Sequence, residues 1–268
     1  MQSQALQASI KSHCIAIDTS TQIQSLTARW AGQSVCMSET SLQLAECVRQ
    51  LAMPVGDLDL RLLDYIAVGT GPGVFTGVRS GLSFAQGLAM ALGVPCVGIN
   101  SFAAQAQRAI MQSGVSEDRV QVLIVRRIKK EMYCISLWQS QALQQEPELV
   151  LEPSIWDGTS TLTQHQIARS DRHLFCADSA LNQFGEYRTL CKSALEALGW
   201  AHWDWMEPVE LGADLASAVA GLAQQRWQMQ ADALRNLAVE QIEPEYLPGA
   251  HWKTLKEQQE ATRPKLLV

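Results

Sequence analysis

The sequence lacks the features of membrane, secreted and disulfide-bonded proteins. No apolar run reaches the roughly 18 residues of a membrane-spanning helix. The first residues, MQSQALQASIKSHC, contain no basic start followed by an apolar stretch, so we expect no signal peptide. The seven cysteines are scattered and form no C-x-x-C pair, which predicts buried, reduced thiols in a cytoplasmic protein.

Motifs of several enzyme classes are absent as well. The five histidines form no H-E-x-x-H pattern, so we expect no metal site in this chain alone. The serine nucleophile motif G-x-S-x-G does not occur. A net charge of −6 argues against a protein that binds nucleic acid alone through a basic surface, although a subunit of a larger RNA-handling complex still fits.

What the sequence does contain is an alternation of strands and helices. In the first part, periodicity predicts strands at 13–17, 24–30, 34–37, 63–69 and 95–99 and helices at 41–53, 76–92 and 101–113. After Gly114 the order nearly repeats, with strands at 119–125, 131–138, 147–152 and 173–177 and helices near 161–169, 189–198 and 212–228. The pattern predicts an α/β protein with an N-terminal lobe, residues 1–113, and a smaller C-terminal lobe, residues 114–268, each a mixed sheet with flanking helices.

A glycine-rich stretch, GTGPGVFTGVRSG at 69–81, is similar in composition to a phosphate-binding loop but fails both nucleotide motifs. A Walker loop needs a lysine where Val78 follows Gly77, and a G-x-G-x-x-G fingerprint has Val74 or Thr76 at its third glycine. We predict Thr76 as the N-cap of the helix that follows. Amides exposed at such a helix start can bind an anion, and a tight capped turn with nothing bound is the alternative.

The helix predicted at 76–92 is apolar on nearly every side. Its only long polar side chains are Arg79 and Gln86, so it has almost no face suited to water. A row of small residues, four apart, would let another backbone approach closely: Gly81, Ala85 and Ala89. We predict that one side of this helix covers the sheet of its own lobe and that the other contacts a second protein. A helix buried entirely within the chain is the alternative.

Two stretches carry a family resemblance, IAIDTST at 15–21 and LDYIAVGTGPGVFTGVRSGLSFAQGLAMALGVPCVGINSF at 63–102. With them the sequence resembles the TsaB (YeaZ) family, strongly in its N-terminal part and weakly elsewhere. EMYCISLW at 131–138 and IEPEYLPGAHWK at 242–253 resemble the second-lobe strand and the C-terminal strand of the family. The resemblance implies the two-lobed actin-like fold, which is also called ribonuclease H-like.

The resemblance implies a role as well. TsaB proteins are regarded as non-catalytic scaffolds that dock the catalytic paralogue TsaD and work with the small ATPase TsaE. The complex places a threonylcarbamoyl group on an adenosine beside the anticodon of tRNA. By similarity, this chain has no catalytic residue, meets tRNA through the complex, and docks a TsaD-like partner or a second copy of itself through helices 41–53 and 76–92. The implied interface residues are Leu44, Val48, Leu51, Phe75, Thr76, Gly77, Arg79, Gly81, Leu82, Ala85 and Ala89.

The sequence departs from the family pattern at two places. Many members carry a His-Ser pair before the first helix, where this chain reads MSETSLQLAEC. Many carry Asp-Ala-Arg ahead of a Glu-x-Tyr strand, where this chain reads VRRIKKEMY. We therefore expect altered chemistry at the surfaces that face a partner.

An actin-like fold also raises the question of a nucleotide. ATPases of this superfamily hold the nucleotide between two hairpins, one from each lobe, with acids that position Mg²⁺. The second hairpin, within VLIVRRIKKEMY at 122–133, is basic and has no aspartate. We therefore expect no cofactor tightly bound by this chain, and ATP or ADP with Mg²⁺ only at the level of the complex. The candidate anion or nucleotide contacts in the first lobe are Asp18, Thr19, Ser20, Gly71 and Gly73.

Both halves of this candidate site have simpler interpretations. A strand-end aspartate such as Asp18 commonly bonds the amides of its own turn. The basic run at 126–130 is either a solvated turn or an anion contact, for example to tRNA. Two other functions therefore stay open: an autonomous actin-like ATPase or kinase, and a homodimeric interaction protein.

Overall fold

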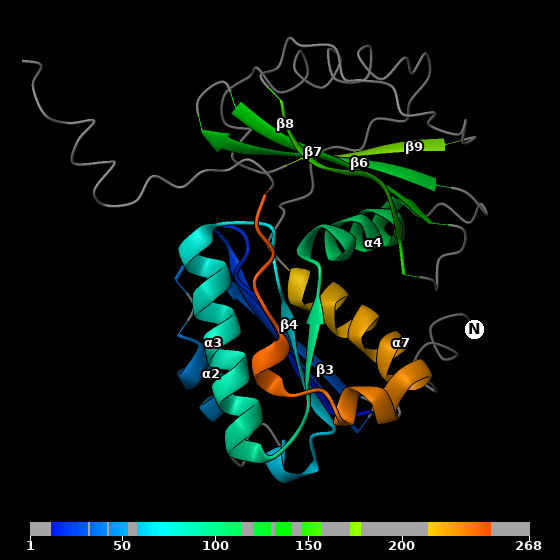
Figure 1. Cartoon of the computed structure of the whole chain (residues 1–268). Helices are drawn as coiled ribbons and strands as arrows, with labels where there is room; N and C mark the ends of the chain where they lie inside the picture. The colour runs from blue at the N-terminus through cyan, green and yellow to red at the C-terminus, as the bar shows by residue number, and fades with distance from the viewer. Residues whose placement is uncertain are drawn as a thin grey trace, which may run out of the picture.

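The computed structural model describes residues 12–31, 33–41, 43–52, 58–113, 120–129, 132–140, 146–156, 172–177 and 214–247. Figure 1 shows two sheets, one in each lobe, with helices between and beside them. The helices predicted near 161–169 and 189–198 lie outside the described residues.

The first lobe is built on a five-stranded sheet of order β3-β2-β1-β4-β5. Its strands are β1 (Cys14–Asp18), β2 (Gln24–Trp30), β3 (Gln33–Glu39), β4 (Tyr65–Gly69) and β5 (Cys96–Ile99). β1 pairs antiparallel with β2 and parallel with β4, and β4 pairs parallel with β5. The central strands β1 and β4 are buried along their whole length, because helices cover both faces of the sheet.

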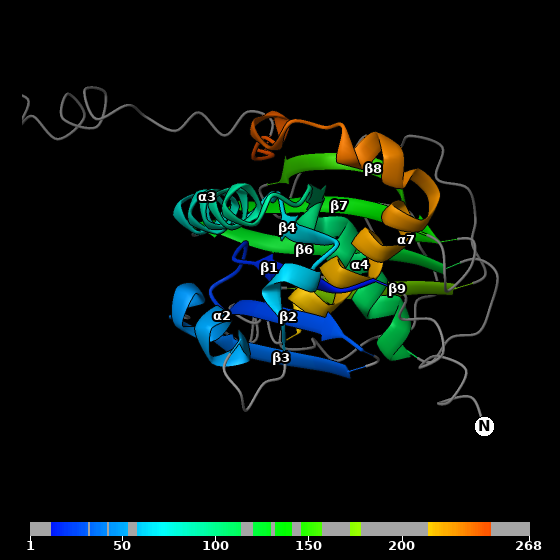
Figure 2. The same ribbon diagram turned by 90° about the horizontal axis from the view of Figure 1, so that it is seen from below.

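Four helices flank this sheet: α2 (Leu44–Ala52), α3 (Phe75–Leu92), α4 (Ser101–Ser113) and α7 (Leu215–Arg235). Side chains that alternate along β1 face two different helical layers. Ile15 and Ile17 join a buried cluster with α2 and α3, whereas Cys14 and Ala16 join the opposite cluster with α4 and α7. Figures 1 and 2 show the two helical pairs on opposite sides of the sheet.

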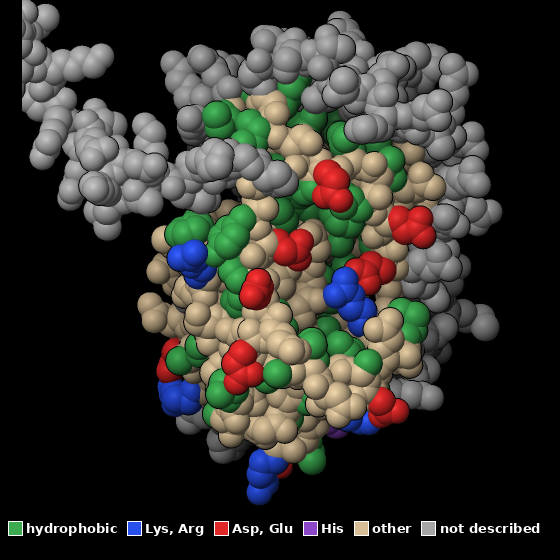
Figure 3. Space-filling view, viewed as in Figure 1, with side chains coloured by type: hydrophobic (Ala, Val, Ile, Leu, Met, Phe, Trp, Pro, Cys, Tyr) green, Lys and Arg blue, Asp and Glu red, His purple; other side chains and the backbone are tan. Residues whose placement is uncertain are grey.

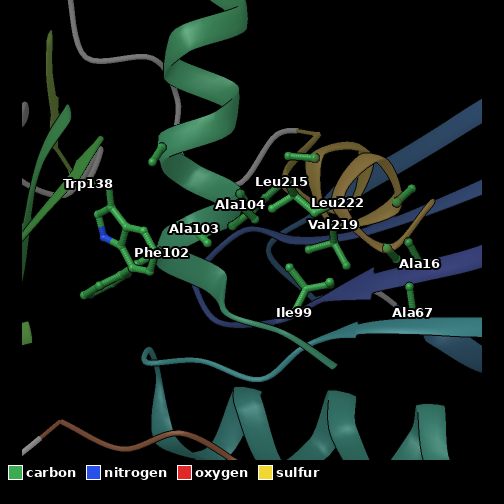
Figure 4. Close-up of a cluster of buried hydrophobic side chains, with 14 of the residues drawn as sticks. Ala16, Ala67, Ile99, Phe102, Ala103, Ala104, Trp138, Leu215, Val219 and Leu222 are labelled. Atoms are coloured by element: carbon green, nitrogen blue, oxygen red, sulfur yellow. The ribbon is translucent and has the colours of Figure 1, made fainter. Parts of the chain in front are cut away.

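The second lobe is a four-stranded sheet of order β8-β7-β6-β9. Its strands are β6 (Val120–Lys129), β7 (Met132–Ser140), β8 (Glu148–Trp156) and β9 (Arg172–Ala177). α4 lies between the two sheets, and its Phe102 lies near Trp138 of β7 (Figure 4). Phe102, Trp138 and Leu215 belong to one buried cluster, so a single hydrophobic core joins the two lobes.

The chain returns to the first lobe after the second sheet. α7 packs on the first sheet, where the hydroxyl oxygens of Ser217 and Thr27 lie 3.0 Å apart and Arg29 Nη2 donates to the Ser217 carbonyl at 2.9 Å. The short helix η2 (Val239–Gln241) then leads to a final segment beside α3. This placement corrects the predicted lobe boundary for residues 214–247, which the sequence order assigned to the second lobe.

The described cysteines are free thiols. Four of them are buried and Cys36 is half-buried. Their burial agrees with the predicted reduced thiols at these positions, while the side chains of Cys176 and Cys191 lie outside the described part of the structure.

Candidate functional site

Parallel strands of the first sheet bring their carboxyl ends to one edge. β1 ends at Asp18, and β4 ends at Gly69 before the glycine-rich turn. A Cβ on Gly69 would lie 2.0 Å from Asp18 Oδ2, and one on Gly73 would lie 2.2 Å from the Ser20 carbonyl oxygen. Gly71 has a φ of 95°, which glycine adopts without strain. The glycines therefore let this turn lie directly against the end of β1.

The Asp18 carboxyl is fully buried at this edge. Its Oδ1 accepts hydrogen bonds from the Ser20 amide at 2.9 Å and hydroxyl at 2.8 Å, and its Oδ2 accepts from the Ser101 hydroxyl at 2.8 Å. Burial raises the pKa of Asp18, while these hydrogen bonds and the charge of Arg126 oppose the rise. Asp18 thus bonds its own turn, which is the simpler of the two interpretations of its sequence.

The other candidate anion contacts also bond within the first lobe. Thr19 Oγ1 donates to the Gly77 carbonyl at 2.7 Å, and the Gly71 amide donates to Ser101 Oγ at 3.1 Å. The Ser20 carbonyl accepts from the Val74 amide at 2.8 Å. The structure therefore brings the predicted residues together, and the polar atoms named here already bond other groups of the protein.

Of the predicted basic run at 126–130, the structure describes the side chain of Arg126. It is 6% exposed and lies between the lobes, so it is not part of a solvated turn. Its Nη1 donates to the Pro72 carbonyl of the glycine turn at 2.7 Å. The side chains of residues 127–130 lie outside the described part of the structure.

α3 begins one residue earlier than predicted. Its N-cap is Val74, which makes no side-chain capping hydrogen bond, and Thr76 lies exposed in the first turn. The prediction of Thr76 as the cap is therefore wrong. The Val74 carbonyl already accepts the first helical hydrogen bond, from the Val78 amide at 2.9 Å.

The row of small residues that the sequence pattern identified, Gly81, Ala85 and Ala89, faces the chain's own sheet. A Cβ on Gly77 would lie 2.2 Å from the Thr19 carbonyl oxygen, and one on Gly81 would lie 2.1 Å from Thr19 Oγ1. These contacts correct part of the predicted interface, because residues already covered by their own lobe leave no surface for a partner. The buried members of that prediction are Val48, Leu51, Gly77, Gly81, Leu82, Ala85 and Ala89.

The opposite side of α3 faces outward. Its exposed residues recur at helical spacing and are small or uncharged: Thr76, Ser80, Ser83, Gly87 and Met90. We call this row the outer stripe. Arg79 is the only charged residue of the whole helix, and it is exposed beside the stripe. Of the other predicted interface residues, Leu44 and Phe75 are half-buried.

An aromatic cluster closes the amino-terminal end of α3. The Arg79 guanidinium lies 4.0 Å from the centre of the Phe75 ring, and its Nε donates to the Tyr246 hydroxyl at 2.7 Å. The neighbouring Glu245 carboxylate accepts hydrogen bonds from Thr70 Oγ1 and Asn100 Nδ2, both at 2.5 Å. We call residues 242–247 the C-terminal strap. No sequence pattern predicts these contacts, since only tertiary packing brings residues 79 and 246 together.

Clustered charges or clustered metal ligands on the described part of the surface would indicate a binding site. On the face that Figure 3 shows, the described Lys and Arg side chains are separated from one another by acidic, apolar and uncharged groups. Among the described residues, no three or more His, Cys, Asp or Glu side chains lie together as a metal site would need. No described helix has the length and apolar character to cross a membrane.

Two lobes of mixed sheet that share one buried cluster, with the glycine turn at the end of β4, have the actin-like fold. A family model described as "TsaD: tRNA N6-adenosine threonylcarbamoyltransferase" matches residues 36–142. The solved structure of YeaZ from Pseudomonas aeruginosa has a TM-score of 0.67 to this chain at 24% identity, covering 88% of this chain and 100% of that one.

Sequence relatives point the same way. The tRNA threonylcarbamoyladenosine biosynthesis protein TsaB of Escherichia coli (strain K12) is 32% identical over 154 residues, which cover 53% of this chain and 63% of that protein. The protein of the same name from Haemophilus influenzae (strain ATCC 51907 / DSM 11121 / KW20 / Rd) is 37% identical over 100 residues, covering 35% and 42%. The chain thus matches less than two thirds of the length of these relatives. The chain is similar to proteins of the TsaB (YeaZ) family.

Proposed function

We propose that this chain is a non-catalytic subunit of the machinery that makes threonylcarbamoyladenosine in tRNA. In this role it docks and activates a TsaD-like catalytic subunit and works with a TsaE-like ATPase. Its relatives are named for this biosynthesis, and the family model that matches it is that of the transferase. Contact with tRNA, and binding of ATP or ADP with Mg²⁺, belong in this proposal to the assembled complex.

The outer stripe of α3 is the observation that carries the proposal. A helix on a water-facing surface normally presents charged side chains there, whereas this 18-residue helix has a single one, Arg79. The stripe also includes Met90, whose side chain is 61% exposed. α2 covers the same face of the sheet as α3 and joins the same buried cluster (Figure 2). In this proposal the second protein contacts both helices. The same surface on a second copy would give a homodimer.

The test places a charge in the middle of the outer stripe. Ser83→Arg should weaken binding to the purified TsaD-like protein of the same organism by at least about tenfold, or about 1.4 kcal/mol, since the charge would have to be desolvated at the contact. Calorimetric titration measures the affinity. Ala233→Arg, on the exposed side of α7, is the matched control and should bind as the wild type does.

Both variants should keep the thermal midpoint of the wild type, because positions 83 and 233 are exposed. Unchanged binding by Ser83→Arg would contradict docking through α3. Light scattering of the same variant without partner separates the alternatives: loss of a homodimer with intact heteromer formation would assign the outer stripe to self-association.

A further inference from the structure

Arg126 connects the two lobes through its side chain. It belongs to β6 of the second sheet, yet its guanidinium ends at the first lobe. Nη1 donates to the carbonyls of Pro72 at 2.7 Å and Ser20 at 3.2 Å, and Nη2 donates to the Ser20 hydroxyl at 3.3 Å. A buried arginine is stable only when its donors are satisfied, and these acceptors satisfy them with backbone and hydroxyl oxygens.

α4 completes the surroundings of this guanidinium. The centre of the Phe102 ring lies 4.7 Å from the guanidinium carbon, which suits cation–π contact. With the Gln105 amide turned so that its oxygen faces Arg126, it accepts a hydrogen bond from Nε at 3.2 Å and another from Nη2. The planar fork of arginine therefore meets acceptors along its edge and an aromatic ring on its face, a combination that lysine cannot match.

A carboxyl group joins the same network through one hydroxyl. Ser20 Oγ accepts from Arg126 and donates to Asp18 Oδ1 at 2.8 Å. Three donors surround the Asp18 carboxyl, an arrangement that suits its ionised form. The Asp18–Ser20–Arg126 chain thus runs from the end of β1 in one lobe to β6 in the other, entirely inside the protein.

We propose that Arg126 is an internal ligand that fills a guanidinium site at the junction of the lobes and locks them in this arrangement. The oxygens of Ser20 and Pro72 point at a cation, so the same turns do not present a pocket to a phosphoryl group while Arg126 is in place. A second bridge supports the lock: Arg226 of α7 donates to Glu146 Oε2 at 2.9 Å and to the Gly98 carbonyl at 2.7 Å.

Chemical rescue tests the site directly. Arg126→Ala should lower the thermal midpoint by about 5 °C or more, because it leaves buried acceptors unpaired. Ethylguanidinium at millimolar concentration should then raise the midpoint of this variant in a saturable way by re-occupying the vacated site. Arg79→Ala is the matched control, since Arg79 also stacks on a phenylalanine but lies exposed, and it should show no saturable rescue.

A rescue of neither variant, or of both alike, would overturn the proposal. If Arg126→Ala does not fold, Arg126→Gln allows hydrogen exchange to be followed instead. The Val74 amide, which donates to Ser20, should exchange at least tenfold faster than in the wild type, and unchanged exchange would contradict the lock.

Titration with MgATP decides whether the guanidinium of Arg126 bridges the lobes or binds a phosphate. The wild type should show no saturable binding. Binding by the wild type that Arg126→Gln weakens would make Arg126 a phosphate ligand and would also overturn the proposal. Neither result depends on the docking partner, so failure of this inference and failure of the proposed function remain distinguishable.

Discussion

At the scale of single residues, Asp18 shows how burial and hydrogen bonding compete. Burial favours the neutral carboxyl, whereas Ser20, Ser101 and the charge of Arg126 favour the carboxylate. Burial has the larger effect, so the pKa of Asp18 in the folded protein lies above its value in the unfolded chain. This difference links the stability of the whole protein to pH.

Asp18→Asn should remove that link. Between the unfolded and the folded pKa of Asp18, the folded state binds more protons, so this carboxyl stabilises the fold as the pH falls towards about 4 and destabilises it as the pH rises. The wild type should therefore gain stability relative to Asp18→Asn as the pH is lowered from 7.5 to 4.5. Thermal unfolding of both proteins at matched pH measures the difference, and two parallel curves would contradict the prediction.

Residue patterns predicted part of the site and missed the contact of Arg126 with the first lobe. Asp18, Thr19, Ser20 and the glycines were identifiable because they follow strands whose carboxyl ends meet at one edge. The role of Arg126 was not, since the four basic residues within 126–130 look alike until the lobes are docked. Which of them points inward depends on the register of β6 against β7.

At the scale of elements, α3 contains glycines of two kinds. Gly81 lies against Thr19 of its own lobe, whereas a Cβ on Gly87 would meet nothing within 4 Å. Helical periodicity identifies the row of small residues but does not say which neighbour it faces. The sequence therefore predicted the helix within one residue at its start, and assigned its small-residue side to the wrong neighbour.

Two alanine substitutions in α3 should consequently have opposite effects. Gly81→Ala should destabilise the protein by about 1–3 kcal/mol, because the added methyl displaces the Thr19 hydroxyl that bonds Gly77. Gly87→Ala should stabilise it by up to about 1 kcal/mol through helix propensity alone. Urea unfolding measures both. Equal effects of the two substitutions would show that the close approach of α3 to Thr19 is absent.

At the scale of the whole molecule, the hydrophobic core does not follow the division of the sequence into an N-terminal and a C-terminal part. α7 comes late in the sequence and covers the face of the first sheet that carries Cys14 and Ala16. Sequence order alone could not reveal this return, because an alanine-rich amphipathic helix would pack equally well on either sheet. We therefore expect the lobes to unfold as one cooperative unit rather than as two independent domains.

A fragment of residues 12–113 should therefore fail to fold by itself. Without α7, one face of its sheet would expose a buried apolar layer that includes Tyr65 and Ile99. We expect no cooperative thermal transition by circular dichroism for the fragment, and a single transition for the full chain. A sharp transition in the fragment would mean that the N-terminal half folds without the returning helix.

The C-terminal strap has a practical consequence for any assembly experiment. Tyr246, near the end of the described residues, lies beside the first turn of α3, where its hydroxyl accepts from Arg79. The first described strand instead starts near Asp64, which accepts from the His13 amide at 2.7 Å. The described chain ends at residue 247 near the helix that the proposed partner docks on, so a C-terminal purification tag or fluorophore is the riskier choice. A label attached ahead of residue 12 joins the chain at the opposite end of β1, and is the safer handle for capturing the complex.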